Sequence, residues 1–271
     1  MQATEHDLAT RASAGLEAAL AAGEAAMARF GTADLGLESK GDGTPVTLAD
    51  REAERVIRGI LADRFPDDTK IGEEYDDDHG DSPYRWIIDP IDGTFSFSRA
   101  VPLFATLIAL QDERRIDETG HGVVFGVIHI PGIGETVHAT RGGGARWLFR
   151  GEERPARVSA IDTLDRATVC YTSLEHFRAE PAKSQIERVL HDTKHSRGWC
   201  DAFAPLLLAT GRCDIVLEKD VQVWDVAPWP VIIEEAGGRY SDWAGGHSID
   251  GGSALATNAR LHDEVLGLLR A

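Results

Sequence analysis

Residues 86–97, WIIDPIDGTFSF, place Asp89 and Asp92 three positions apart, between a hydrophobic run and a Gly-Thr pair. Asp, Pro and Gly are common in turns, so one interpretation of the stretch is a simple turn. The second interpretation is chemical: two carboxylates and a free backbone carbonyl, held rigidly by Pro90, would form half of a magnesium site. The rest of the sequence decides between the two.

The chain has 271 residues, of which 42% are hydrophobic, and this is enough for one large domain or two closely packed lobes. Its formal net charge of -17 argues against a nucleic-acid-binding surface, which needs basic residues. Bound cations would offset part of this charge. No apolar run approaches the roughly 18–20 residues that cross a bilayer, so we expect neither a nucleic-acid partner nor a membrane.

The first thirty residues carry acids early and lack the basic start and apolar centre of a signal peptide. Three cysteines, Cys170, Cys200 and Cys213, are widely spaced and form no C-x-x-C pair. This spacing is typical of ordinary reduced thiols, so we expect a cytoplasmic protein.

In the first half of the chain, hydrophobic periodicity predicts two helices followed by a run of strands. The helices cover about residues 6–29 and 48–65, with a loop or short hairpin between them. The strands are expected at about residues 70–74, 85–89, 103–112, 121–131, 135–140 and 144–149. Short turns join the later strands, and this pattern is typical of an antiparallel sheet.

After about residue 155 strands and helices alternate. Strands are expected at 166–172, 214–218 and 254–258, and helices at 182–190, 200–211, 224–238 and 263–270. We therefore predict an α+β chain that forms one unit over residues 1–271. An α+β lobe of about residues 1–155 would carry the metal site, and an α/β lobe of about 156–271 would carry the substrate site.

Four further carboxylates lie at the ends of predicted elements, where loops can bring them to Asp89 and Asp92. They are Asp50, Glu73, Glu74 and Asp225. Oxygen ligands without a matching His or Cys cluster favour Mg²⁺, or Mn²⁺, over zinc. Two such ions about 3.5–4 Å apart hold an attacking water and the leaving oxygen of a phosphate ester in line. Gly93 and Thr94 would offer backbone N–H groups to the phosphate.

Each acid also has a purely structural interpretation. Asp225 could be the N-cap of a helix, and Asp50 could cap the helix that follows it. Glu73 and Glu74 could form a solvated strand end. The occurrence of all these acids together, in this order, is what the structural interpretation explains poorly.

Four motifs, GDGTPVTLAD, IGEE, WIIDPIDGT and WDVAPWPVIIEEAGG, resemble the successive signatures of the inositol monophosphatase superfamily over about residues 40–240. The resemblance implies a fold of alternating αβαβα layers and a homodimer. It also implies magnesium-dependent hydrolysis of small phosphate monoesters without a phosphoenzyme.

Carried over by position, the resemblance implies a ligand set for two or three ions. Glu73, Asp89 and the Ile91 carbonyl would hold the first ion, and Asp89, Asp92 and Asp225 the second. Asp50 and Glu74 would lie near a third, weaker position. Thr94, paired with Glu73, would position the nucleophilic water. Ser96 stands where many relatives have Asn, a departure that leaves the implied ligands intact.

The phrase CDAFAPLLLATGRCDI is similar to the histidinol-phosphate phosphatase branch, in which an acid precedes an aromatic as Asp201 precedes Phe203 here. An acidic pocket of Asp201 and Glu218 would favour the ammonium and imidazole of L-histidinol phosphate over a neutral polyol, which would place the enzyme in histidine biosynthesis. Arg197 would line the pocket wall or pair with a neighbouring acid.

Three alternatives stay open. Asp201 could simply cap the helix that begins there. The substrate could be inositol 1-phosphate, or a broad set of small monophosphates. The chain could also be chiefly an interaction protein of the same fold, although its intact ligand set argues against an inactive enzyme.

Overall fold

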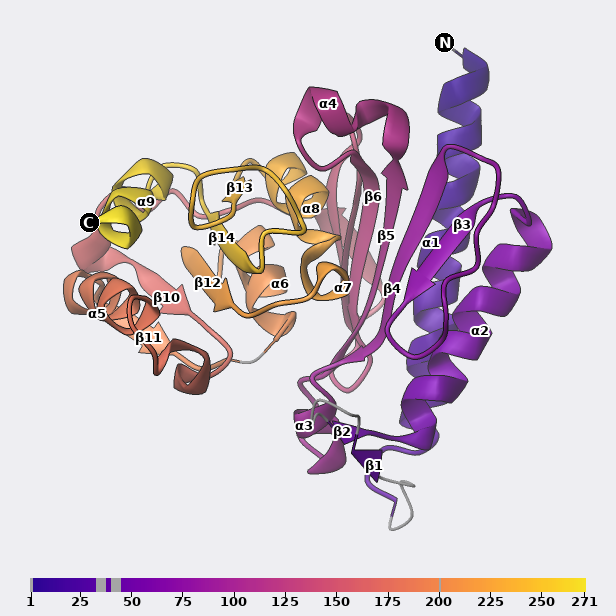
Figure 1. The fold of residues 1–271 in the computed structure, drawn as a ribbon, viewed down its shortest axis with the longest axis horizontal. Coiled ribbons are helices and arrows are strands. Elements are labelled where there is room, and N and C mark those ends of the chain that lie inside the picture. Colours follow the sequence, from indigo (N-terminus) through magenta and orange to yellow (C-terminus); the bar gives the residue numbers. More distant parts are fainter. Residues whose placement is uncertain (1, 33–37, 40–44, 200) are drawn as a thin grey trace.

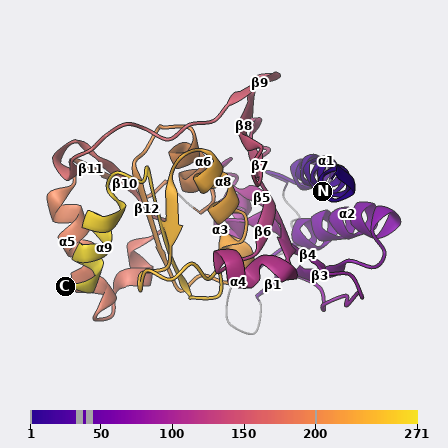
Figure 2. The ribbon, with the colours of Figure 1, turned by 90° about the horizontal axis from the view of Figure 1, so that it is seen from above.

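The computed structural model describes residues 2–32, 38–39, 45–199 and 201–271. Helices and sheets alternate through it in five layers (Figures 1 and 2). A pair of helices, a seven-stranded sheet, a central helical layer, a five-stranded sheet and an outer helical pair follow one another. The predicted αβαβα arrangement is therefore confirmed.

The first layer consists of α1 (Gln2–Met27) and α2 (Leu48–Arg64), which pack against one face of the large sheet. Helix α1 approaches the sheet closely because its inner face is built from alanine and glycine. A Cβ added at Gly15 would lie 2.5 Å from the ring of Phe125, so this contact requires glycine. Helix α2 begins at the N-cap Thr47, and between the helices β1 (Glu38–Ser39) pairs with β2 (Pro45–Val46). The remainder of the expected loop or hairpin lies outside the described residues.

The large sheet follows the chain order without a crossover. Its strands are β3 (Thr69–Gly72), β4 (Tyr84–Asp92), β5 (Ala105–Asp112), β6 (Val123–Ile130), β7 (Glu135–Thr140), β8 (Gly144–Phe149) and β9 (Glu152–Pro155). All neighbours pair antiparallel except β3 and β4, which are parallel. The predicted antiparallel sheet is therefore confirmed for five of the predicted strands, β4 to β8, and β9 extends it.

A β-bulge interrupts the ladder between β4 and β5 at the motif. Asp89 lies opposite Leu107 and Asp92 lies opposite Ala105, so β4 carries one residue more than β5 between the two pairs. The Thr106 hydroxyl donates to the Pro90 carbonyl at 2.9 Å inside the bulge. The strand predicted to stop at Asp89 thus continues through Asp92, and the turn predicted at Gly93 opens a short helix, α3 (Thr94–Ser98).

The five-stranded sheet has the order β11-β10-β12-β14-β13. Its strands are β10 (Thr168–Cys170), β11 (His195–Arg197), β12 (Ile215–Lys219), β13 (Arg239–Ser241) and β14 (Ser253–Thr257). Strand β10 is parallel to β11 and β12, whereas β14 is antiparallel to β12 and β13. Strands β9, β11 and β13 have three or four residues each and escape prediction because so short a run carries little periodicity.

Helices α6 (Phe203–Ala209), α7 (Val223–Val226) and α8 (Trp229–Glu235) lie between the two sheets, where they share one hydrophobic core with both. Helices α5 (Ala182–Asp192) and α9 (His262–Arg270) cover the outer face of the smaller sheet. The remaining short helices are α4 (Ile116–Thr119) and the 3₁₀ turns Glu113–Arg115, Leu164–Arg166 and Leu174–Phe177. Among the described residues, no helix is both long and apolar enough to cross a membrane.

The single helix predicted over residues 224–238 is wrong, because the structure divides it into α7 and α8. Pro228 and Pro230 lie at the division, and proline has no N–H to donate to the preceding turn of a helix. The division turns Asp225 toward the end of β4, as the site geometry shows.

Candidate active site

Three carboxylates from two distant segments converge at the end of β4. Asp89, Asp92 and Asp225 each offer an oxygen, and these oxygens lie within 4.8 Å of one another. Asp225 is the third residue of α7, and its Oδ2 accepts the backbone N–H of Gln222 at 2.8 Å. Asp225 is therefore not the N-cap of α7, although its position in the sequence allows that role. It is the N3 residue of a capping box in which Gln222 is the N-cap.

The carboxylates in this cluster perturb one another's protonation. Burial, and then the negative charges of Glu73 and Asp92, raise the pKa of Asp89 well above its ordinary value. Burial, and then Asp201 and Asp225, raise the pKa of Asp92 in the same way. Carboxylates that must share so small a volume repel one another unless they bind protons or cations.

One buried oxygen of the cluster has no hydrogen-bond partner in the part of the chain that the structure describes. Asp89 is 1% exposed, and its Oδ1 is buried without a hydrogen bond from any described residue. Asp92 receives one donor, the Ala202 N–H, at 2.6 Å from its Oδ2. A buried acceptor oxygen surrounded by acids is an arrangement that a bound divalent cation satisfies, so the residues fit the predicted metal.

Asp50 lies beside the cluster and is held by Thr47. Its Oδ2 accepts the Thr47 backbone N–H at 2.8 Å and the Thr47 hydroxyl at 2.6 Å. Its Oδ1 lies 3.2 Å from the hydroxyl of Thr94. Burial raises the pKa of Asp50, although the Thr47 donors oppose the shift. Asp50 thus belongs to the capping box of α2, as its structural interpretation allows, and also faces the site.

The Thr94 hydroxyl contacts Asp50 and lies 3.1 Å from the Ile91 carbonyl. The pairing of Thr94 with Glu73 that the resemblance implies stays a prediction. Asp50 belongs to α2, which approaches the end of β4 from the first layer, and this approach is invisible in the sequence. We therefore assign Asp50 as the acid that orients Thr94.

Glu73 and Glu74 follow β3; the Glu73 N–H donates to the Ile88 carbonyl of β4 at 3.3 Å, and Glu74 is anchored on α2. Glu54, buried on that helix, accepts the Glu74 N–H at 2.8 Å and is paired with Arg58 at 2.7 Å. The charge of Glu73 raises the pKa of Asp50 and of Asp89, which shows that Glu73 lies beside both.

Two supporting residues, Thr47 and Glu54, escape the sequence analysis. Thr47 begins the phrase TLAD, which resembles a capping box with aspartate in place of glutamate. Glu54 shares the buried face of α2 with Asp50, Ile57 and Leu61, so an acid at an otherwise apolar helical spacing was its signal.

The predicted substrate acids lie on the other side of the cluster. The hydroxyl of Thr172, which follows β10, donates to Glu218 Oε1 at 2.7 Å and accepts the Asp201 N–H at 2.8 Å. The Asp201 carboxylate lies against the turn at Gly93, because a Cβ added at Gly93 would lie 2.7 Å from Asp201 Oδ2. Gly93 itself has a φ of 85°, which favours glycine.

The structure decides one alternative for Asp201. Helix α6 starts after Ala202, and no side chain caps it, so the helix-cap interpretation of Asp201 is wrong. Burial raises the pKa of Asp201 to about 6, with a hydrogen bond to Thr172 opposing the shift. Burial also raises the pKa of Glu218 well above its ordinary value.

Arg197 lies at the exposed end of β11. Its guanidinium donates to the Ser196 carbonyl at 2.7 Å and lies 5.9 Å from the ring of Trp199. Its contact with substrate stays a prediction.

Comparison with known proteins agrees with this geometry. The sequence profile described as the inositol monophosphatase family matches residues 7–271. The chain is 40% identical to the histidinol-phosphatase of Chlorobaculum parvum, over 89% of each chain. It is 34% identical to the inositol-1-monophosphatase of Caulobacter vibrioides, over 94% of this chain and 99% of that protein. The crystal structure of extragenic suppressor protein suhB from Bartonella henselae superposes with a TM-score of 0.84 at 29% identity, covering 95% of this chain and 97% of that one.

Proposed function

The chain belongs to the inositol monophosphatase family and is a phosphoric monoester hydrolase, and on this premise we propose that it hydrolyses L-histidinol phosphate to L-histidinol and inorganic phosphate with magnesium. One observation carries the choice of substrate. Two acids, the half-buried Asp201 and the buried Glu218, adjoin the proposed metal-binding carboxylates, and Glu218 Oε2 has no hydrogen-bond partner among the described residues. The similarity to a histidinol-phosphatase supports the same choice.

The metal would be held by the residues that the resemblance implies. Glu73, Asp89 and the Ile91 carbonyl would bind one ion, and Asp89, Asp92 and Asp225 another. Asp50 and Glu74 adjoin a third position. When bound, Mg²⁺ or Mn²⁺ would neutralise the phosphate charge and stabilise the oxygen that leaves. The unpartnered Oδ1 of Asp89 supports this assignment.

Asp50 and Thr94 would prepare the water. The Thr94 hydroxyl, oriented by Asp50 Oδ1, accepts a hydrogen bond from a water placed next to the phosphorus. As the water oxygen attacks phosphorus, its proton passes through the Thr94 oxygen toward Asp50. The ester P–O bond breaks, and the leaving oxygen takes up a proton from a second water to give the alcohol. Glu73 lies beside both Asp89 and Asp50 and would keep the water in line.

The water and the leaving group would lie on opposite sides of the phosphorus. The backbone N–H groups of Gly93 and Thr94 would hold the phosphate. The ammonium and imidazole of histidinol would lie against Asp201 and Glu218, where charge-assisted hydrogen bonds are strong. Arg197 would border the pocket from β11.

A second candidate substrate is inositol 1-phosphate. The inositol-1-monophosphatase of Caulobacter vibrioides is similar over nearly the whole chain, and carboxylate oxygens also accept hydrogen bonds from hydroxyl groups.

The test is phosphate release from L-histidinol phosphate and from inositol 1-phosphate, each with and without Mg²⁺, compared as kcat/KM. We expect a preference of about 100-fold or more for L-histidinol phosphate, since an unpaired buried charge discriminates strongly. Equal or higher kcat/KM for inositol 1-phosphate would overturn the proposed substrate. Activity that chelators leave intact would overturn the proposed metal.

We extend the proposal to a homodimer acting in the cytoplasm. The family resemblance supports the dimer, and the free buried thiols of Cys170 and Cys213 support a reducing compartment. Light scattering on the purified protein should give about twice the chain mass of 29.4 kDa.

A further inference from the structure

Thr172 joins the two acids of the substrate pocket. It lies two residues beyond Cys170 in β10, and Glu218 lies two residues beyond Val216 in β12, which is the residue paired with Cys170. The parallel register therefore brings Thr172 level with Glu218. The 2.7 Å hydrogen bond from the Thr172 hydroxyl to Glu218 Oε1 follows from this register.

The same hydroxyl accepts the backbone N–H of Asp201 at 2.8 Å. A threonine hydroxyl has one proton and two lone pairs, so it donates to Glu218 and accepts from Asp201 at the same time. Asp201 needs such a support, because its φ of 42° lies in the left-handed region that residues with a side chain rarely adopt. The support directs the Asp201 carboxylate toward Gly93.

The arrangement leaves acceptors open toward a ligand. Thr172 occupies Glu218 Oε1, while Glu218 Oε2 is buried without a partner among the described residues, and the whole side chain is 3% exposed. A buried carboxylate oxygen of this kind is best satisfied by the N–H groups of a cation. A neutral hydroxyl would leave the charge uncompensated.

We infer that Thr172 is a positioning residue that sets the preference of the enzyme for phosphate monoesters whose alcohol carries a protonated amine. It acts through Glu218 and Asp201 and does not itself touch the reacting atoms. The inference rests on the proposed function and deepens it, because it names the residue that makes the two acids a single cation site.

The experiment compares Thr172→Val, Thr172→Ser and a control, Thr168→Val, with the unmodified enzyme. Valine keeps the shape of threonine without the hydroxyl, and serine keeps the hydroxyl. Thr168 lies in the same strand, and its bond to Asp214 uses the backbone N–H, which valine retains. Steady-state kinetics are measured with L-histidinol phosphate and inositol 1-phosphate, and melting temperatures confirm folding.

For Thr172→Val we expect KM for L-histidinol phosphate to rise about tenfold or more, with kcat changed less than about threefold, since one charge-assisted hydrogen bond is lost. KM for inositol 1-phosphate should change much less. Thr172→Ser should restore the preference, and Thr168→Val should retain it. Calorimetric titration of the magnesium-loaded enzyme with L-histidinol, in the presence of inorganic phosphate, should show the same loss without turnover.

The outcomes separate the two proposals. If the unmodified enzyme lacks a preference for the cationic substrate, the proposed function is wrong and this inference falls with it. If the unmodified enzyme has the preference and Thr172→Val keeps it, the inference alone is overturned. Equal losses for both substrates, or a Thr172→Ser variant as poor as valine, would mean that Thr172 has only a structural role.

Discussion

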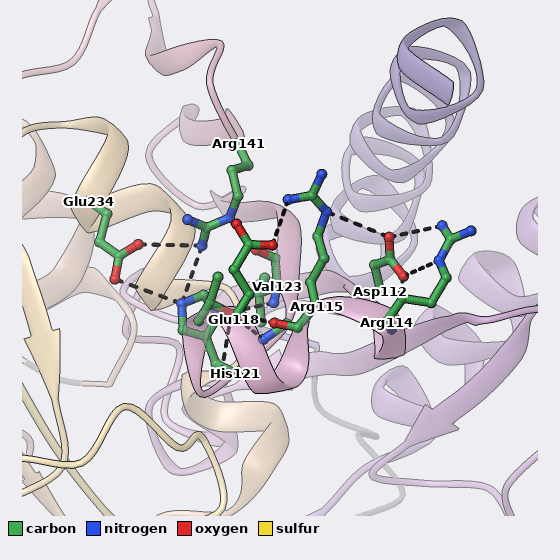
Figure 3. Close-up of polar contacts among 10 residues, drawn as sticks. Asp112, Arg114, Arg115, Glu118, His121, Val123, Arg141 and Glu234 are labelled. Atoms are coloured by element: carbon green, nitrogen blue, oxygen red, sulfur yellow. Dashed lines mark hydrogen bonds and ion pairs between the residues drawn. The ribbon is translucent and has the colours of Figure 1, made fainter. Parts of the chain in front are cut away.

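Two groups of acids lie at opposite ends of the large sheet, partly on its strands and partly on the helices packed against it, and their surroundings differ. At one end of the sheet, Asp112 is paired with Arg114 at 2.7 Å, and Glu234 with Arg141 at 3.3 Å (Figure 3). Burial alone would raise the pKa of Asp112, but the hydrogen bonds from Arg114 lower it. At the other end the neighbours of Asp89 are further acids, and its pKa is raised.

This difference separates acids that stabilise the fold from acids that have another task. The paired group also holds its loop: His121 accepts the Val123 N–H at 2.9 Å and lies 3.7 Å from Glu234 (Figure 3). The site acids accept hydrogen bonds from backbone and hydroxyl groups, but they also repel one another. Strongly perturbed carboxylates gathered at the end of a strand are typical of catalytic and metal sites.

The largest expected effect is the difference in kcat between asparagine variants of the two groups of acids. Asp89→Asn should lower kcat by about three orders of magnitude or more, because Asp89 is the carboxylate shared by both proposed ion sites. Asp112→Asn should leave kcat within about twofold of the unmodified value, because its partners lie at the other end of the sheet. Phosphate release with saturating Mg²⁺ measures both. An Asp89→Asn enzyme with near-normal turnover would remove the two-ion assignment.

The next effect concerns the Thr94–Asp50 pair. Thr94→Val should lower kcat by about 100-fold to 10,000-fold, since it removes the hydroxyl that orients the water and passes its proton. Thr94→Ser keeps the hydroxyl and should retain most of the activity. Single-turnover rates distinguish this from slow product release. Equal activity of the valine and serine variants would show that the hydroxyl has no part in the reaction.

A smaller effect should appear in the pH dependence of substrate binding. The pKa of Asp201 is raised to about 6, so its carboxylate forms only as the pH rises through that value. KM for L-histidinol phosphate should therefore fall by about tenfold between pH 5 and pH 7, as one charge appears in the pocket. The Asp201→Asn enzyme is the control, and it should lack the part of this dependence that Asp201 causes. Identical pH profiles for both enzymes would exclude Asp201 from cation binding.

The smallest effect is on the free energy of unfolding of the metal-free protein. An asparagine substitution should change this free energy in opposite directions in the two groups of acids. A raised carboxylate pKa means that stability is present at low pH and is lost as the pH rises, so Asp89→Asn should stabilise the metal-free protein increasingly from pH 5 to pH 8. The lowered pKa of Asp112 means the reverse, so Asp112→Asn should cost about 1 kcal/mol near neutral pH and less in acid. Denaturant unfolding in chelator measures both. Parallel pH curves for the two variants would contradict the comparison.

The sequence predicts the layered fold and most of the helices and strands, because hydrophobic periodicity is a local property. It also predicts the acids that converge, since Asp89, Asp92 and Asp225 each lie close to the end of a predicted element. What it misses depends on contacts across the fold. The pairing of Thr94 with Asp50 requires the approach of α2 to β4, and the role of Thr172 requires the register of β10 and β12.

Two predictions are wrong, and each has a local cause in the backbone. The predicted helix over 224–238 ignores Pro228 and Pro230, which divide it. The possible N-cap role of Asp201 follows from its position before α6. The backbone of Asp201 is left-handed, however, and no side chain forms a capping hydrogen bond with this helix.

The bulge in β4 has a consequence for how the site tolerates mutation. An Asp-x-Asp pair in a regular strand would already present two carboxylates on one face, but its carbonyls would be used in the ladder. The extra residue between Asp89 and Asp92 takes Pro90 and Ile91 out of register with β5, so that the Ile91 carbonyl is turned to Thr94 and the proposed ion. Proline, which has no N–H to donate, suits this break. A main-chain oxygen persists whatever side chain replaces isoleucine, so one ligand of the site is protected from every substitution that keeps the bulge.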